Sequence, residues 1–183
     1  MARASDFSVM NLRTPAGILY LQSSPEGLRR CAFLGSPELR MAEELSAAHP
    51  NTDLLKAAVE QLGEYFQGAR HSFSVPLNLS GLAPFQTRVL IACAEIPWGE
   101  TRTYAQLAGS IASPGASRAV GSALARNPLL LFIPCHRVIG SDGALRGFAA
   151  PDGIRTKAWL LQHEGWPVVD EKTIKPIHTG ATS

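Results

Sequence analysis

The chain has 183 residues, 45% of them hydrophobic and 17% charged, which is enough to bury one large core or two small ones. Its apolar runs stay well short of the roughly 18 residues that a membrane span needs, and its first twenty residues lack the basic start and apolar centre of a secretory signal. These features exclude a membrane-spanning protein and favour a soluble one that works in the cytoplasm.

Cysteine content and charge narrow the class further. Cys31, Cys93 and Cys135 are scattered and form no Cys-x-x-Cys pair, which argues against a disulfide framework and against a thiolate zinc site. The net charge is only +2, but residues 101–163 hold seven cations, six of them arginine, against two acids. This excess suits either a solvated basic face or contacts with nucleic acid, and charge alone does not choose between them.

The amino-terminal part predicts a hairpin followed by one helix. Apolar runs at 18–21 and 31–34 are typical of strands, and the Ser-Ser-Pro-Glu-Gly sequence between them is typical of a turn. Apolar side chains at helical spacing then predict a helix over 55–66, which Thr52 or Asp53 would cap.

A further strand and a domain boundary come next. Hydrophobic side chains alternate over 73–79, which predicts a half-buried strand despite the proline inside it. The sequence Ser-Gly-Leu-Ala-Pro at 80–84 is then typical of a linker. We therefore expect an amino-terminal structural domain at 1–80, a second domain at 81–170 and a flexible tail at 171–183.

The second domain opens with a predicted helix. Pro84 suits the first turn of a helix, and Pro97 would end it. Cys93 lies on the apolar face of this helix, so we interpret it as a buried structural residue, as we do Cys31 in its strand.

Two short helices joined by a tight turn then predict a helix-turn-helix. Residues 103–106 have the Thr-x-x-Gln form of a capping box, Ser-Pro-Gly at 113–115 breaks the helix that follows, and a second helix is expected over 116–125. The outer face of this second helix is made of small side chains, with Arg118 and Arg126 as the large exceptions. Small residues suit close helix packing as well as close approach to nucleic acid, and the arginines favour the second interpretation.

The most reactive residue follows a buried apolar run. Residues 129–133 are continuously apolar and predict a buried strand, which Cys135, His136 and Arg137 follow almost at once. Positive charge beside a cysteine lowers its pKa and favours the nucleophilic thiolate. Because adjacent side chains of a strand point to opposite faces, His136 would act on the thiol through a water or a bend in the chain.

Glu164 is the candidate third member of this group. It ends a predicted helix over 153–163, where a carboxylate opposes the helix dipole, and Gly165 terminates that helix. Such a locally unfavourable residue is often functional. An anionic Glu164 would hold His136 in one tautomer and raise its basicity, as in a nucleophile–base–acid relay. The turn-rich loop 141–147 would line the pocket.

These segments together resemble the O6-alkylguanine-DNA alkyltransferases, also called methylated-DNA–protein-cysteine methyltransferases. The sequence Ile-Pro-Cys-His-Arg-Val-Ile-Gly at 133–140 resembles the active-site motif of that family. Further matches follow in the family's order and spacing: Phe85-Gln86, Ile96 to Thr101, Tyr104, Arg118 to Gly121, Asn127-Pro128 and His163 to Gly165. The resemblance is strong over 85–165 and is one of layout alone over 1–80. It implies an α+β fold, in which a small domain of antiparallel sheet plus helix precedes a mostly helical DNA-binding and active-site domain.

The resemblance also implies a mechanism of direct DNA repair. Cys135 would accept the alkyl group of O6-alkylguanine irreversibly, so that one protein molecule repairs one lesion without a cofactor. His136 would be the general base through a water, and Glu164 would orient that histidine. Tyr104 would donate a hydrogen bond to the purine as guanine leaves, and Asn127 would fix the turn before the active-site segment. The resemblance leaves open a minor activity on O4-alkylthymine.

The implied partner is double-stranded DNA, bound through the minor groove and independently of sequence. Arg118 would fill the gap that the extruded nucleotide leaves. The other implied DNA contacts are Thr103, Ala119, Gly121, Ser122 and Arg126. The implied base pocket is formed by Arg137, Val138, Phe148 and Ala149, with backbone groups of residues 135, 138 and 149 reading the base edges. The protein would be a monomer in solution that could assemble cooperatively on DNA.

Two departures from the family pattern limit what the resemblance implies. Phe148 stands where many members have tyrosine, and Ala149-Ala150-Pro151 lacks their glycine-rich continuation, which leaves open the range of alkyl groups accepted. Some relatives bind zinc in the first domain, but Cys31 is accompanied there only by His49 and His71, so we predict no metal.

Three alternatives remain at this point. Alkyltransferase-like proteins recognise the same lesions without repairing them, but they typically carry tryptophan at the position of Cys135. A cysteine hydrolase that uses Cys135 and His136 would leave the helix-turn-helix and Arg118 unexplained. A DNA-binding regulator should prefer a sequence and should lose nothing when Cys135 is replaced.

Overall fold

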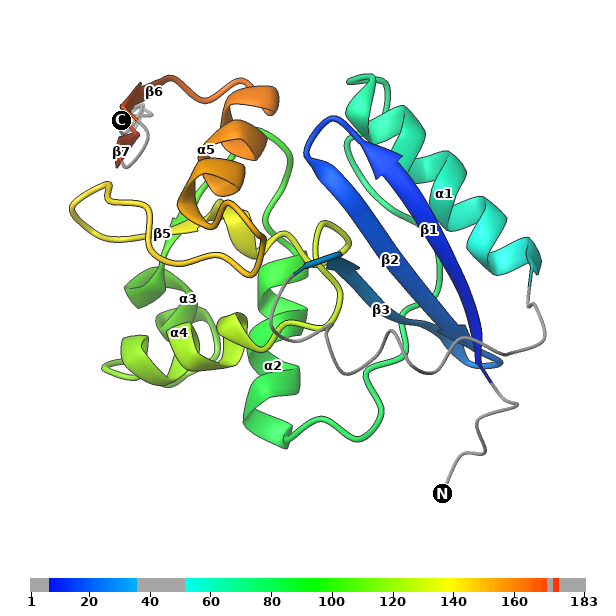
Figure 1. Cartoon of the computed structure of the whole chain (residues 1–183). Coiled ribbons are helices and arrows are strands. Elements are labelled where there is room, and N and C mark those ends of the chain that lie inside the picture. The colour runs from blue at the N-terminus through cyan, green and yellow to red at the C-terminus, as the bar shows by residue number, and fades with distance from the viewer. Residues whose placement is uncertain (1–6, 36–51, 171–172, 175–183) are drawn as a thin grey trace.

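An antiparallel sheet opens the fold. The computed structural model describes residues 7–35, 52–170 and 173–174, and its first sheet has the order β1 (Ser8–Thr14), β2 (Gly17–Ser24) and β3 (Gly27–Phe33) (Figure 1). The hairpin of β2 and β3 confirms the predicted pair of strands, with longer ends. Strand β1 was not predicted from the sequence, and it pairs with β2 along its whole length.

Helix α1 (Thr52–Phe66) confirms the predicted helix and packs against this sheet. Its Leu55, Ala58 and Leu62 belong to the same buried cluster as Leu19 and Leu21 of β2. In the view of Figure 1 the sheet lies between α1 and the later helices. Each inward side chain of this size contributes on the order of 1.5–3 kcal/mol when it leaves water, so the amphipathic spacing of α1 accounts for its position.

The predicted strand at 73–79 is wrong. Among the described residues, this segment pairs with the sheet at Leu77 alone, in an isolated parallel bridge to Leu28. The carbonyl of Pro76 accepts from Leu28 N at 2.8 Å, and Asn78 N donates to Leu28 O at 2.8 Å. Proline has no N–H to give, so it interrupts a hydrogen-bond ladder and leaves a short contact in place of a strand.

The later helices agree with the sequence prediction. Helix α2 (Pro84–Ala94) has proline in its first turn and buries Cys93 completely. Helices α3 (Tyr104–Ser110) and α4 (Ser117–Ala125) form the predicted helix-turn-helix. The capping box is present, because Gln106 N donates to Thr103 Oγ1 at 3.1 Å and Thr103 N donates to Gln106 Oε1 at 2.7 Å. Strand β4 (Arg102–Thr103) pairs in parallel with β5 (Val138–Ile139).

The predicted strand at 129–133 is also wrong, although the segment is as buried as expected. Within the described residues it makes two isolated bridges, from Leu129 to Cys31 and from Leu130 to Ile133. Leu131 has a φ of 72°, which bends the chain too sharply for a strand. Cys31 N donates to Pro128 O, and Leu130 N donates to Cys31 O, both at 2.8 Å. The segment therefore joins the sheet to the helical part of the molecule.

The carboxyl-terminal part holds one helix and a small hairpin. Helix α5 (Ile154–His163) is followed by strands β6 (Val168–Asp170) and β7 (Thr173–Ile174), which pair antiparallel. Residues 173–174 are therefore ordered as a strand, and the rest of the tail predicted at 171–183 lies outside the described residues.

One buried cluster runs through the whole α+β fold. It includes residues of β2, α1, α2, α4 and the 129–133 segment, and so it crosses the boundary predicted at residue 80. The division into domains at 1–80 and 81–170 stays a prediction. Within the described ranges no helix is long and apolar enough to cross a membrane.

Candidate active site

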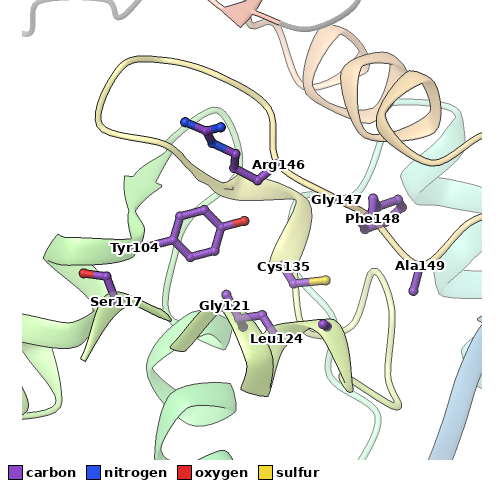
Figure 2. A pocket seen from close by; sticks show the side chains of 10 residues that line it. Tyr104, Ser117, Gly121, Leu124, Cys135, Arg146, Gly147, Phe148 and Ala149 are labelled. Atoms are coloured by element: carbon purple, nitrogen blue, oxygen red, sulfur yellow. The ribbon is translucent and has the colours of Figure 1, made fainter. Parts of the chain in front are cut away.

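A cavity of about 450 Å³ opens between the helix-turn-helix and the loop before α5 (Figure 2). Such a volume lies within the range of pockets that hold small organic ligands. Its walls come from α3, α4, the loop 146–149 and the residue that begins the 3-10 helix η3 (Cys135–Arg137). The lining residues are Tyr104, Ser117, Gly121, Leu124, Ala125, Cys135, Arg146, Gly147, Phe148 and Ala149.

Cys135 is a buried thiol at the wall of this cavity. Cys135 is the first residue of η3, and it does not follow a strand as the sequence predicted. Its backbone N donates to the carbonyl of Ile133 at 2.8 Å. Burial raises the pKa of Cys135, and a hydrogen bond from Asn127 and the charge of Lys157 offset this only in part. The expectation that His136 and Arg137 hold a resting thiolate is therefore wrong. The thiol keeps its proton until a base removes it.

His136 is such a base. Its Nε2 lies 2.8 Å from Glu164 Oε1, so the expected contact between these two side chains is present. A carboxylate only accepts hydrogen bonds, and the neutral ring therefore carries its proton on Nε2. Nδ1 is then a free lone pair, and among the described residues it has no hydrogen-bond partner. Burial lowers the pKa of His136 against the opposing effect of Glu164, so the ring rests neutral and ready to accept a proton.

The Glu164 carboxylate has two side-chain partners in addition to His136. Arg137 donates to it from Nε at 2.7 Å and from Nη2 at 2.9 Å, and Tyr65 Oη donates to its Oε1 at 2.8 Å. Burial alone would raise the pKa of Glu164, but His136 and Arg137 outweigh it and hold that pKa well below its ordinary value. The carboxylate therefore stays anionic across the physiological range. Tyr65, which α1 supplies, was missed because it also fits the apolar stripe of that helix.

The assignment of Arg137 and Val138 to the base pocket is not matched by their side chains. Both residues are buried, and neither lines the cavity that contains Cys135. The Arg137 guanidinium is occupied by Glu164 and by the carbonyl of Ile96, to which Nη1 donates at 2.6 Å. Because its guanidinium is hydrogen-bonded to a buried carboxylate, Arg137 does not contact a base. It also does not belong to the exposed basic surface that the charge of residues 101–163 suggested. Phe148 and Ala149 do line the cavity.

Lys157 is a functional candidate that the sequence shows only as one of the seven cations of residues 101–163. It is 1% exposed, and its Nζ donates to Val138 O at 2.6 Å and to Arg146 O at 3.1 Å. It also lies 5.9 Å from the centre of the Tyr104 ring. Burial lowers the pKa of Lys157 to about 8. The lysine ties two sides of the active-site loop to α5, and no pattern in the sequence distinguishes it from an exposed helical lysine.

Asn127 fixes the turn that follows α4. Its Nδ2 donates to Ile133 O at 2.9 Å, and its Oδ1 accepts from Leu129 N at 3.0 Å. The two bonds close the loop between the helix-turn-helix and Cys135, so both amide atoms of a buried side chain are satisfied. This placement sets the thiol beside the end of α4.

The predicted DNA-contacting residues lie along the outer part of the helix-turn-helix. Arg118, Ala119, Ser122 and Arg126 are exposed, and Thr103 is half-buried as the cap of α3. Gly121 faces the cavity, where a side chain would stand 3.7 Å from the Tyr104 ring. Gly121 therefore packs against Tyr104 at the cavity, while Ala119 and Ser122 present small side chains on the exposed surface of α4.

Metal binding has no support in the part of the chain that the structure describes. Within these residues, no three His, Cys, Asp or Glu side chains are grouped so that they could hold an ion. His49, one of the residues considered for zinc, lies outside the described residues.

The fold and the site define a class of protein in which a helix-turn-helix is followed by a buried cysteine and a hydrogen-bonded histidine–glutamate pair. The family model described as 6-O-methylguanine DNA methyltransferase, DNA binding domain, matches residues 84–166. The model described as the ribonuclease-like domain of the same protein matches residues 10–79. The chain belongs to the 6-O-methylguanine DNA methyltransferase family.

Individual relatives agree with this assignment. The constitutive methylated-DNA–protein-cysteine methyltransferase of Bacillus subtilis (strain 168) is 42% identical over 154 residues, which cover 82% of this chain and 91% of the relative. A Mycobacterium tuberculosis protein of the same name is 45% identical over 148 residues, covering 77% and 88%. The crystal structure of Mycobacterium tuberculosis OGT in complex with DNA has a TM-score of 0.74 and 38% identity, covering 84% of this chain and 90% of that one.

Proposed function

We propose that this protein repairs O6-alkylguanine in double-stranded DNA by moving the alkyl group onto Cys135. The observation that supports this best is geometric: the buried thiol of Cys135 lines a cavity together with residues of α3 and α4, and the next residue, His136, is hydrogen-bonded to the buried Glu164. The thioether product is inert, and no described side chain near it could regenerate the thiol. One molecule would therefore act once.

The proton of the thiol must leave as the sulfur attacks. Because Nδ1 of His136 is the free ring atom, a water between Nδ1 and Sγ would carry the proton to the imidazole. Glu164 would stabilise the imidazolium that forms and hold its orientation. The sulfur–carbon bond then forms as the bond between carbon and guanine O6 breaks, and guanine leaves with the electron pair.

Tyr104 and Asn127 would both serve this step. Burial raises the pKa of Tyr104 to about 12, so its hydroxyl stays a donor and would stabilise the charge that develops on the purine. Asn127 would hold the turn that presents Cys135. Phe148 and Ala149 would form the wall against the base, while backbone groups at 135, 138 and 149 would read its edges.

The lesion must leave the base stack to reach this site. An alkyl carbon inside a stacked duplex is out of reach of a buried sulfur, and extruding the nucleotide costs a few kcal/mol. We propose that α4 enters the minor groove and that Arg118 occupies the space left behind, with Thr103, Ala119, Gly121, Ser122 and Arg126 close to the backbone. Contacts of this kind would make binding independent of sequence. We propose that the protein acts on DNA in the cytoplasm and is a monomer in solution. Several molecules could then assemble cooperatively on the same DNA.

The proposed function is tested by following the alkyl group. We expect a duplex with radiolabelled O6-methylguanine to transfer its label to the peptide that contains Cys135 and to stop at one group per protein molecule. Repeated turnover would instead indicate a hydrolase, and tight binding without transfer would indicate an alkyltransferase-like protein. Peptide mapping by mass spectrometry and a titration of label against protein distinguish these results.

Replacing Arg118 with alanine should slow repair of duplex DNA without changing the thiol. Since the wedge offsets part of the few kcal/mol needed for extrusion, we expect the rate constant with duplex to fall roughly 10- to 100-fold. The rate with free O6-methylguanine base should stay as in the wild type. The matched control is Arg88→Ala, which removes an exposed arginine from a different helix, α2. A wild-type rate of Arg118→Ala on duplex would remove the wedge from the mechanism.

A further inference from the structure

A tyrosine of the amino-terminal part reaches the carboxylate behind the reactive cysteine. Tyr65 lies at the end of α1, 99 positions before Glu164, and its Oη donates to Glu164 Oε1 at 2.8 Å. Both residues are buried, with 1% and 3% of their surface exposed. Separate family models match residues 10–79 and 84–166. This hydrogen bond therefore joins the two matched segments in the interior of the protein.

Three donors meet at one oxygen of the carboxylate. Oε1 of Glu164 accepts from Tyr65 Oη, from His136 Nε2 at 2.8 Å and from Arg137 Nη2 at 2.9 Å. A carboxylate oxygen offers about two lone pairs, so these donors must share its negative charge. The hydroxyl of Tyr65 therefore takes up part of the charge that would otherwise act on His136.

The ring of Tyr65 is held in place by other aromatic rings. Its centre lies 5.2 Å from that of Trp98 and 5.3 Å from that of His163, both edge-on, and 5.6 Å from that of Phe73. His163 Nε2 also lies 2.8 Å from the backbone carbonyl of Tyr65. A ring that is confined in this way gives its hydroxyl a fixed position. The hydroxyl in turn limits where the Glu164 carboxylate can lie.

We propose that Tyr65 is a positioning residue of the alkyl-transfer reaction, whose hydroxyl fixes the Glu164 carboxylate against the ring of His136. The inference rests on the proposed function, since it adds a member to the relay of Cys135, His136 and Glu164. Burial and the neighbouring carboxylate raise the pKa of Tyr65 well above its ordinary value, so the phenol keeps its proton throughout. The amino-terminal part thereby contributes a side chain to the reaction.

The pH profile of Tyr65→Phe tests this role. Phenylalanine keeps the ring and its packing, and removes the hydroxyl alone. More of the carboxylate charge then acts on His136, so the acidic limb of the single-turnover rate profile should move to higher pH by about half a unit. The plateau rate with an O6-methylguanine duplex should fall about 3- to 10-fold, because a less confined carboxylate orients the histidine less well.

The pKa of His136 can also be followed in the resting protein without DNA. An NMR titration of the five histidine rings measures it, and His136→Asn identifies the signal by its loss. Glu164 raises this pKa, while burial, Arg137 and Lys157 lower it. All of these charged groups are kept in Tyr65→Phe. A rise of the His136 pKa in that variant therefore reports the loss of the hydroxyl.

Tyr20 supplies a matched control. It lies in β2, it is 6% exposed, and its Oη has no hydrogen-bond partner among the described residues. Tyr20→Phe removes the same buried hydroxyl from the same part of the chain. It should leave the plateau rate, the acidic limb and the pKa of His136 as in the wild type.

The possible results separate positioning from support of the fold. If Tyr65→Phe loses stability in denaturant but keeps the wild-type limb and the wild-type pKa of His136, the tyrosine only supports the fold and the proposal is wrong. A wild-type plateau rate in Tyr65→Phe, or an equal shift of the limb in Tyr20→Phe, overturns it as well. A wild-type protein that transfers no methyl group would refute the proposed function, and the NMR titration would still show whether Tyr65 acts on His136.

Discussion

Cys135→Ser should abolish alkyl transfer while the protein still binds lesion-containing duplex. Serine keeps the shape of the side chain, but its hydroxyl is far less acidic and less nucleophilic than a thiol, and a neutral imidazole deprotonates it poorly. We expect the transfer rate to fall by at least about 10³-fold, the scale on which loss of a nucleophile acts. Gel-shift titration would measure binding, and label transfer would measure the reaction.

The other two cysteines are the natural controls for this variant. Cys31 and Cys93 are fully buried, and burial raises the pKa of both thiols. Neither lines the cavity, so Cys31→Ala and Cys93→Ala should still take up one alkyl group per molecule, with some loss of stability from the space each leaves. Label recovered on either of these residues, or on the serine variant, would contradict the assignment of Cys135 as acceptor.

Periodicity and end signals predicted most of the helices. The apolar stripe of α1, the proline that opens α2 and the Thr103 capping box each combine a local rule with a clear boundary, and all three are confirmed. Such features depend on contacts within a few residues, which the sequence displays directly.

The two false strands failed for a common physical reason. Segments 73–79 and 129–133 are as apolar as strands, but what they bury against comes from distant parts of the chain. Pro76 removes a donor from the first, and the positive φ of Leu131 bends the second. Burial sets the hydrophobicity of such a segment, and ladder geometry is a separate condition that the composition does not reveal.

The chemistry of the site was only partly visible in the sequence. A carboxylate at the end of α5 and a histidine beside a cysteine suggested a relay, and their contact is present. The effect of Arg137 was misjudged, because a neighbour in sequence was taken for a neighbour of the thiol. Its guanidinium points instead to Glu164, and the charge that reaches Cys135 comes from Lys157, a residue 22 positions away. Tertiary structure decides which charges act on a buried group.

Glu164→Gln should slow transfer strongly and destabilise the fold as well. Glutamine has nearly the shape of glutamate but no charge, so Arg137 keeps one acceptor and loses its counter-ion inside the protein. Breaking a buried ion pair costs roughly 3–5 kcal/mol, and we expect about 3 kcal/mol because the amide oxygen still accepts. Denaturant unfolding would measure this loss, and Glu60→Gln on the exposed face of α1 is the control for a change of charge alone.

The pH dependence of Glu164→Gln separates the catalytic effect from the structural one. Glu164 raises the pKa of His136, so its neutralisation should lower that pKa further and weaken the base. The rate of transfer should fall about 10- to 100-fold at neutral pH, in the range of general-base contributions, and the acidic limb of the rate profile should move to lower pH. Affinity for DNA should stay nearly constant, because the carboxylate is buried away from α4. A slower variant whose acidic limb stays in place would show that Glu164 supports the fold and does not tune the histidine.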